Sequence, residues 1–155
     1  MTKKNHTLST ETKMAQALRY LDKETGAIVP PIQSTATYAR DSNYEIKKPY
    51  WYRRDGNETT SHAEKMVAEL EDATETLLFA SGMSAATSVI DSLNPNAHVV
   101  IPKAMYHGVL NQFQTYEAKE RLKISYYTAG NLEELSNAMQ NNTSLVWVET
   151  PNNPD

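Results

Sequence analysis

The stretch Ala97-His-Val-Val-Ile-Pro102 decides the fold class of this chain. It is a short apolar run, which is typical of a strand covered on both faces of a parallel sheet. Residues 83–93, before it, are rich in Ala and Ser and predict a helix, and residues 107–116, after it, predict another. A buried strand between two helices is the repeating unit of α/β proteins.

The same alternation continues in both directions along the chain. The patterns predict further strands and helices, the strands at residues 76–80, 123–127 and 144–149 and the helices at 58–70 and 131–140. We expect an α/β fold with a mostly parallel sheet flanked by helices, because strand–helix–strand units form right-handed crossovers. The carboxyl ends of parallel strands share one edge of the sheet, and ligands bind beyond that edge.

The N-terminal part of the chain is less regular. Apolar residues recur at helical spacing over residues 13–21, whereas residues 22–48 are irregular and contain many Pro, Ser and Thr residues. A loop of this length is uncommon inside a compact domain. We therefore expect this segment to cover a functional site or to wrap onto another subunit.

Composition excludes several classes of protein. The 155 residues carry a formal net charge of −4 and no cysteine, which excludes disulfides, cysteine metal sites and a thiol nucleophile. No apolar run approaches the about 20 residues of a membrane helix, and no apolar segment follows the basic start, so we expect a cytoplasmic protein. No basic stripe points to nucleic acid, and the histidines show no metal-ligand spacing.

The chain stops directly after the last predicted strand, at residues 150–155. A domain that ended there would leave open sheet edges, which expose unpaired backbone groups. We therefore expect this sequence to be the N-terminal part of a longer chain. The alternative is a compact four-stranded domain.

Ser81, Gly82 and Met83 join a predicted strand to a predicted helix. The backbone N–H groups at a helix N-terminus lack intrahelical partners and form an anion site that suits a phosphate. Glycine allows a ligand to approach the backbone closely. The alternative is a plain turn, because Gly and Ser are general turn formers.

Three further places carry candidate ligand contacts. Tyr52 and Arg54 could hold a phosphate through phenol and guanidinium, or could belong to an ordinary surface loop. Tyr106 could stack on a planar ligand, or could only cover the sheet edge. Glu149 and Asn153 end the last predicted strand, where they could be functional or cap a loop. These patterns predict a phosphate-compatible α/β domain and no particular reaction.

Several motifs, taken together and in order, resemble one enzyme family. They are Gly-Ala-Ile-Val-Pro-Pro-Ile at 26–32, Ser-Thr-Ala-Thr-Tyr at 34–38, Tyr-Arg-Arg-Asp-Gly-Asn at 52–57, Leu-Phe-Ala-Ser-Gly-Met-Ser-Ala at 78–85 and Glu-Thr-Pro-Asn-Asn-Pro at 149–154. The chain resembles, over residues 14–155, the Cys/Met-metabolism enzymes that use pyridoxal 5′-phosphate (PLP). This trans-sulfuration family includes cystathionine γ-synthase, cystathionine lyases, methionine γ-lyase and O-acylhomoserine sulfhydrylases.

The resemblance implies a role for each candidate residue. Ser81, Gly82 and Met83 match the segment that binds the PLP phosphate. Tyr52 and Arg54 match the pair that binds this phosphate in a neighbouring subunit, which implies a homodimer or tetramer. Tyr106 matches the tyrosine that stacks on the pyridine ring and takes part in proton handling. Asn153, and less directly Glu149, match the group at the strand end near the cofactor.

The resemblance also implies the fold and the reaction. The expected fold is the large domain of fold-type-I (aspartate aminotransferase-like) PLP enzymes, with residues 1–57 as an oligomer-contacting arm and 58–155 as an incomplete PLP-binding domain. The expected reaction is γ-replacement or elimination at a C–S or C–O bond of a small amino-acid substrate. No membrane or nucleic-acid partner is expected.

The chain departs from the family pattern at three points. Glu58 stands where the family has Pro, which affects the first turn of that helix. His107 stands where the family often has Gly, which affects the surroundings of the cofactor ring and so the substrate preference. The family's Schiff-base lysine, its pyridine-binding aspartate and its substrate-binding arginine match no position here. We therefore expect the 155-residue chain alone to be inactive. Two alternatives are a truncated, non-catalytic remnant that keeps part of the phosphate site and an unrelated nucleotide-binding domain.

Overall fold

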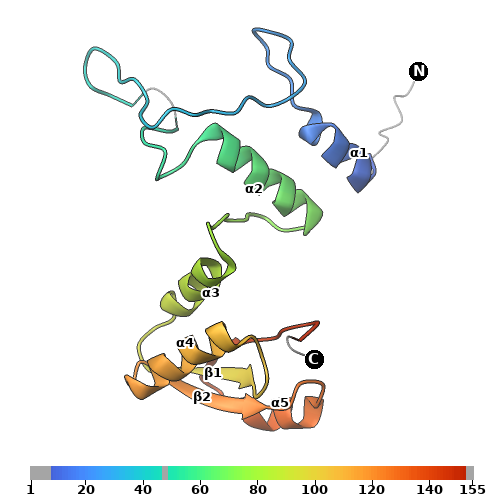
Figure 1. Ribbon diagram of the computed structural model, residues 1–155, viewed down its shortest axis with the longest axis vertical. Helices are drawn as coiled ribbons and strands as arrows, with labels where there is room; N and C mark the ends of the chain where they lie inside the picture. The colour runs from blue at the N-terminus through green and yellow to red at the C-terminus, as the bar shows by residue number, and fades with distance from the viewer. Residues whose placement is uncertain (1–7, 47–48, 153–155) are drawn as a thin grey trace. The chain divides into compact units, whose positions relative to one another are not determined.

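The computed structural model describes residues 8–46 and 49–152 (Figure 1). The chain divides into two compact units, Met1–Leu78 and Phe79–Asp155. The expected boundary after residue 57, between an oligomer-contacting arm and a PLP-binding domain, stays a prediction.

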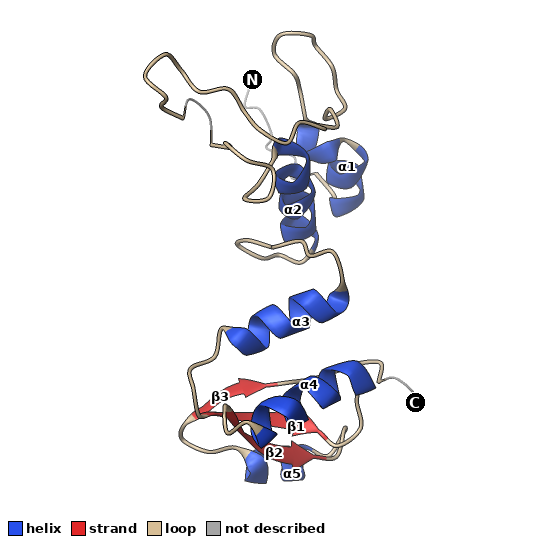
Figure 2. Ribbon diagram, turned by 60° about the vertical axis from the view of Figure 1, so that its left-hand side comes forward, coloured by secondary structure: helices blue, strands red, loops and turns tan. Residues whose placement is uncertain are grey.

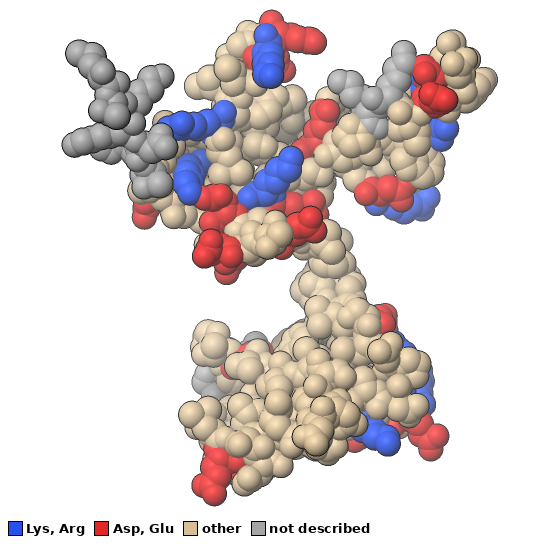
Figure 3. Space-filling model, turned by 180° about the vertical axis from the view of Figure 1, so that it is seen from behind, with Lys and Arg blue, Asp and Glu red and all other residues tan. Residues whose placement is uncertain are grey.

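On the face in Figure 3, acidic and basic side chains are interspersed over the first unit, while the second unit shows mostly uncharged residues.

The first unit begins with a short helix. Helix α1 spans Thr10–Ala15 and is followed by the 3-10 turn η1, Ala17–Arg19. The predicted continuous helix over residues 13–21 is therefore wrong. Residues 17, 18 and 19 have left-handed φ angles of 45°, 56° and 61°, which end the α-helix. Neither element contains a fully buried residue, so only partial packing supports the apolar stripe that the sequence pattern suggested.

Residues 22–46 contain no regular helix or strand, as predicted, and residues 49–57 contain none either. Isolated antiparallel bridges join Thr37 to Tyr52 and Arg40 to Ile46. Two exposed apolar residues of this segment, Ile28 and Ile32, are 72% and 85% accessible to solvent. The segment therefore lacks a hydrophobic core of its own.

Helix α2 spans Glu58–Leu70, the range that the sequence predicted. The buried side chain of Asn57 caps it by accepting a hydrogen bond from the Thr60 N–H at 2.8 Å. Ala68 is buried, whereas Leu70, the last residue of the helix, is 51% exposed.

Residues 76–80 form no strand, so the predicted four-stranded sheet is wrong. A strand needs a neighbouring strand, and no described residue supplies one. Glu64 of α2 instead holds this segment by two hydrogen bonds. Its carboxylate accepts one from the Leu78 N–H at 3.0 Å, and its backbone carbonyl accepts one from the Thr76 hydroxyl at 2.6 Å. Leu77 is consequently 75% exposed.

The second unit contains a three-stranded parallel sheet with the order β2-β1-β3 (Figure 2). Strand β1 spans Ala97–Pro102, as predicted, and all six of its residues are buried. Strand β2 spans Leu122–Tyr127 and strand β3 spans Thr143–Val146. The central position of β1 explains its continuous apolar sequence, because it is covered by strands on both edges and by side chains on both faces.

Strand β3 ends at Val146, earlier than the predicted residue 149, because Pro102 of β1 cannot continue the hydrogen-bond ladder. The Trp147 N–H still donates to the Val100 carbonyl at 2.8 Å. The next ladder bond would need an N–H from Pro102, which proline lacks. The Tyr127 hydroxyl donates to the Trp147 carbonyl at 3.1 Å in its place. The chain is therefore held at the sheet edge without continuing as a strand.

Three helices accompany the sheet. Helix α3 spans Gly82–Asp91, α4 spans His107–Ala118 and α5 spans Leu132–Ala138. Every end of these helices lies within two residues of the predicted one. Asn131 caps α5 by accepting a hydrogen bond from the Glu134 N–H at 3.1 Å. In Figure 2, α3 and α4 lie on one side of the sheet and α5 lies on the other.

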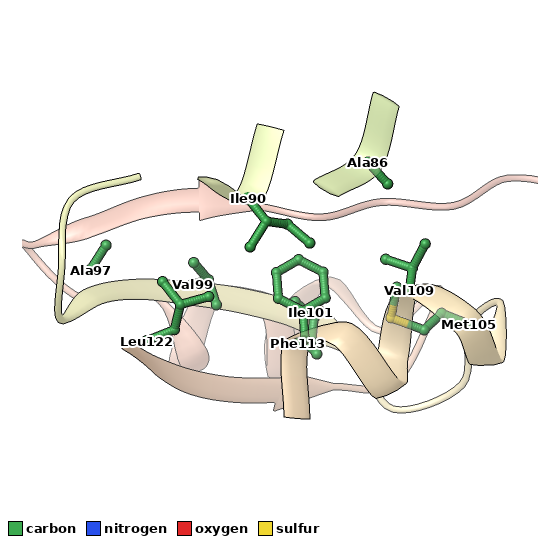
Figure 4. Packing of buried hydrophobic residues seen from close by; sticks show 9 residues of the cluster. All are labelled: Ala86, Ile90, Ala97, Val99, Ile101, Met105, Val109, Phe113 and Leu122. Atoms are coloured by element: carbon green, nitrogen blue, oxygen red, sulfur yellow. The ribbon is translucent and has the colours of Figure 1, made fainter. Parts of the chain in front are cut away.

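The core of the second unit lies between the sheet and helices α3 and α4 (Figure 4). Alternate residues of β1, Val99 and Ile101, pack against Ile90 of α3 and Phe113 of α4. All four side chains are fully buried. This packing joins the strand ends and the N-terminal turn of α3 into one unit.

His98, on the other face of β1, is a buried polar residue with partners on both neighbouring strands. Its Nδ1 lies 2.8 Å from the Thr143 hydroxyl and its Nε2 lies 3.0 Å from the Ser125 hydroxyl. A buried polar group is tolerated when such bonds are made. His98 is therefore part of the sheet's structure.

Candidate functional site

A pocket of roughly 710 Å³ opens in the second unit, beyond the carboxyl ends of β1 and β3. This is the position that the strand–helix alternation predicts for a ligand. The lining residues come from α3 and its N-cap, the start of α4 and the chain after β3, namely Ser81, Gly82, Met83, Ala85, Ala86, Val89, Tyr106, Val109, Trp147, Val148 and Glu149.

The N-terminus of α3 provides hydrogen-bond donors to this pocket. Ser81 is the N-cap, and its hydroxyl accepts from the Ser84 N–H at 3.1 Å. The N–H groups of Gly82 and Met83, in the first turn, have no intrahelical acceptor. No acidic side chain occupies this first turn, so the positive end of the helix dipole is not offset there. The geometry suits a bound anion.

Gly82 leaves open space beside these donors. A Cβ atom placed on Gly82 would have no heavy atom within 4 Å. Its backbone is not in the left-handed region, so the chain conformation does not by itself require glycine. The structure therefore has room for a phosphate where any side chain would intrude.

Tyr106 forms one wall of the pocket at the junction of β1 and α4. The residue is 38% exposed, and its ring lies against Gly108, where a Cβ would be only 2.8 Å from Tyr106 Cε1 and 3.1 Å from Met83 Sδ. The His107 ring lies 4.9 Å away at a 56° tilt. A planar ligand in the pocket would meet an accessible aromatic ring.

Glu149 joins the chain after β3 to the loop after β1. Its Oε2 accepts a hydrogen bond from the Tyr106 backbone N–H at 2.8 Å. The contact brings together two residues that are 43 positions apart in the sequence. Two of the predicted site residues are thus directly connected.

Tyr52 and Arg54 lie close together in the first unit, while every residue of the pocket belongs to the second. The Arg54 guanidinium lies 4.9 Å from the centroid of the Tyr52 ring, a cation–π contact. Their role at a cofactor stays a prediction. The last predicted site residue, Asn153, lies outside the described residues.

Sequence analysis missed the apolar wall of the pocket. Ala85 and Val89 of α3 face it together with Trp147 and Val148. Trp147 is anchored by an edge-on contact with the Phe113 ring, with 5.6 Å between centroids. The spacing of Ala85 and Val89, four residues apart on one helix, is the signal that could have indicated this face.

A second polar cluster lies at the carboxyl ends of β1 and β2. Glu134 Oε2 accepts from Lys103 Nζ at 3.0 Å and from the Thr128 N–H at 2.8 Å. The Lys103 and Thr128 hydrogen bonds lower the pKa of Glu134 from 4.5 to about 2. Lys103 is thereby engaged in an exposed ion pair with Glu134.

Among residues 8–46 and 49–152, none of the helices combines the length and the apolar character that a membrane span requires. The same residues contain no group of three or more His, Cys, Asp or Glu side chains that could hold a metal ion.

Comparison with known proteins gives consistent matches over almost the whole chain. Residues 11–155 match the family described as Cys/Met metabolism PLP-dependent enzyme. Cystathionine gamma-lyase of Dictyostelium discoideum is 34% identical over 143 residues, which are 92% of this chain and 37% of that protein. A probable cystathionine gamma-synthase of Herpetosiphon aurantiacus is 34% identical over 84% of this chain and 40% of its own length.

Solved structures agree. The structure of metB from Corynebacterium glutamicum superimposes with a TM-score of 0.86 at 33% identity, covering 96% of this chain and 39% of that one. Cystathionine gamma synthase from Xanthomonas oryzae, solved with cystathionine, also gives a TM-score of 0.86, at 28% identity and with 96% and 38% coverage. The chain spans about 37–40% of the length of these relatives and corresponds to their N-terminal part. The chain belongs to the Cys/Met-metabolism family of PLP-dependent enzymes, with the α/β fold of that family.

Proposed function

We propose that this chain is the N-terminal portion of a PLP-dependent trans-sulfuration enzyme that acts on sulfur amino acids. The proposed reaction is γ-replacement or elimination at a C–S or C–O bond, as in cystathionine synthases and lyases. The observation that carries the proposal is the pocket, where helix N-terminal donors, the open space at Gly82 and the Tyr106 ring converge. The family membership of the chain supports the identity of the ligand.

The residues present fit the cofactor. The Gly82 and Met83 N–H groups, with the Ser81 turn, would hold the phosphate, because they are donors at a helix N-terminus beside empty space. Tyr106 would lie against the pyridine ring. When bound, PLP supplies an electron sink for the reacting amino acid, while the protein supplies orientation and electrostatics.

The remaining assignments concern proton handling and assembly. The Tyr106 hydroxyl would hold or move a proton beside the ring, and Asn153 would provide a polar contact at the strand end. Tyr52 and Arg54 would bind the phosphate of a neighbouring subunit, supported by their cation–π contact, which places phenol and guanidinium together. The proposal therefore includes a cytoplasmic homo-oligomer in which residues 1–57 act as the intersubunit arm.

The first test is the intact mass of the polypeptide in its source cells. We expect a mass well over twice the 17.4 kDa of this chain, because the relatives are about two and a half times as long. Borohydride reduction with PLP should then label one lysine outside residues 1–155. A mass near 17.4 kDa would favour a non-catalytic remnant that keeps part of the phosphate site. A longer protein without a labelled lysine would contradict the proposed enzyme.

A further inference from the structure

The backbone N–H of Tyr106 has one acceptor, and it comes from a distant part of the chain. Tyr106 lies in the connection between β1 and α4 and occupies the N-cap position of α4 without a side-chain cap. A residue before the first helical turn has no intrahelical partner for its own N–H. Glu149 Oε2 accepts that N–H at 2.8 Å.

The Glu149 carboxylate is presented from a well-anchored backbone. Two residues earlier, the Trp147 N–H donates to the Val100 carbonyl at 2.8 Å, and the Trp147 carbonyl accepts from the Tyr127 hydroxyl at 3.1 Å. The segment after β3 is thus tied to β1 and β2 before it reaches Glu149. Because the backbone that carries Glu149 is fixed in this way, the hydrogen bond between its carboxylate and the Tyr106 N–H also restricts the position of Tyr106.

The Tyr106 ring is limited from the opposite side by helices α3 and α4. A Cβ at Gly108 would lie 2.8 Å from Tyr106 Cε1 and 3.3 Å from Cζ, so only glycine leaves the ring its place. Met83 Sδ closes the same space at 3.1 Å from that Cβ position. The position of Tyr106 is thus restricted twice, by the hydrogen bond of its backbone N–H to Glu149 and by the close approach of its ring to Gly108.

We propose that Glu149 is a positioning residue for Tyr106 and does not bind the cofactor itself. This inference rests on the proposed function, because it concerns the wall against which the cofactor ring would lie. Repulsion between like charges disfavours direct contact of this carboxylate with an anionic ligand, whereas the Tyr106 N–H is a donor that it already binds. Gly108 is the second positioning residue, because its missing side chain leaves space for the Tyr106 ring.

The test separates positioning from direct contact by comparing two substitutions of Glu149. Glu149→Ala removes the acceptor, whereas Glu149→Gln keeps an acceptor oxygen and removes the charge. The exposed Glu133→Ala, on α5 and outside the pocket, is the matched control. The ligand-free readout is the hydrogen-exchange rate of the Tyr106 amide, measured by NMR. We expect an increase of about tenfold or more in Glu149→Ala and about threefold or less in Glu149→Gln.

The second readout is the affinity for deoxypyridoxine phosphate, which has the ring and phosphate of PLP but no aldehyde to react with lysines. Calorimetry should show about tenfold weaker binding for Glu149→Ala and nearly unchanged binding for Glu149→Gln. Gly108→Ala should weaken binding by displacing the ring while the Tyr106 amide stays protected. This variant leaves Glu149 unchanged, so the test survives if Glu149→Ala fails to fold.

Each outcome decides the inference. An unchanged Tyr106 exchange rate in Glu149→Ala would overturn it. Equal loss of affinity in the Ala and Gln variants would also overturn it and would assign Glu149 to direct contact. The binding experiment uses the complete protein. If it and all its variants fail to bind the probe, the proposed function fails at this site. The exchange rates then still show whether Glu149 positions Tyr106.

Discussion

Replacing Gly82 by alanine should change stability and ligand affinity in opposite directions. In the free chain, the new Cβ meets no heavy atom within 4 Å and the backbone conformation suits any residue. The substitution therefore neither clashes nor gains a contact. What remains is helix propensity, since alanine loses less backbone freedom than glycine on folding. The full propensity difference of about 0.5–1 kcal/mol applies to a helix interior, and Gly82 is the first residue of α3, so the free energy of unfolding should rise by at most that amount.

In the complex, the same methyl group occupies the space where the phosphate would approach the Gly82 and Met83 N–H groups. Losing one hydrogen bond to a charged group costs about 1.5–3 kcal/mol. Since 1.4 kcal/mol corresponds to a factor of ten, deoxypyridoxine phosphate should bind about 10- to 150-fold more weakly.

Urea unfolding without ligand and calorimetric titration measure the two effects separately. Ser88→Ala is the matched control, because Ser88 lies on α3, is exposed and does not line the pocket. It should stabilise the helix slightly, by about 0.5 kcal/mol, without changing affinity. A Gly82→Ala chain that is more stable and binds the probe as well as its parent would refute the phosphate assignment at this turn.

Three further substitutions test other parts of the structure. The pKa of Glu134 is lowered from 4.5 to about 2, so its contribution to stability is complete above pH 4.5 and is lost as the pH falls toward 2. Unfolding midpoints measured across this range should show a smaller decline in Glu134→Gln. His98→Ala should reduce the free energy of unfolding by about 2–4 kcal/mol, because the Thr143 and Ser125 hydroxyls lose their partner and a cavity remains. The control, His107→Ala, replaces an exposed residue and should change the free energy of unfolding by less than about 0.5 kcal/mol. In the complete protein, Arg54→Ala should weaken PLP binding about tenfold through loss of a charge-assisted contact, and unchanged affinity would count against the assignment.

Features that depend on neighbouring residues could be predicted from the sequence. Strand β1 and helix α2 have the predicted bounds, because an apolar run of strand length and a helix with Asn57 as its cap are encoded locally. The Ser81–Gly82 turn likewise lies at the start of a helix, as expected. The position of the pocket also followed from sequence, because parallel strands place their carboxyl ends at one edge.

Features that depend on residues far apart in the chain could be known only from the tertiary structure. Residues 76–80 look like a strand, but a strand exists only where another offers its hydrogen bonds, and no described residue does so. Strand β3 ends early because Pro102, on a different strand, cannot donate to the Trp147 carbonyl. The bond between Glu149 and Tyr106 also spans the fold. The sequence determines which segments can form helices, strands and anion sites, whereas packing decides which backbone and side-chain groups find partners.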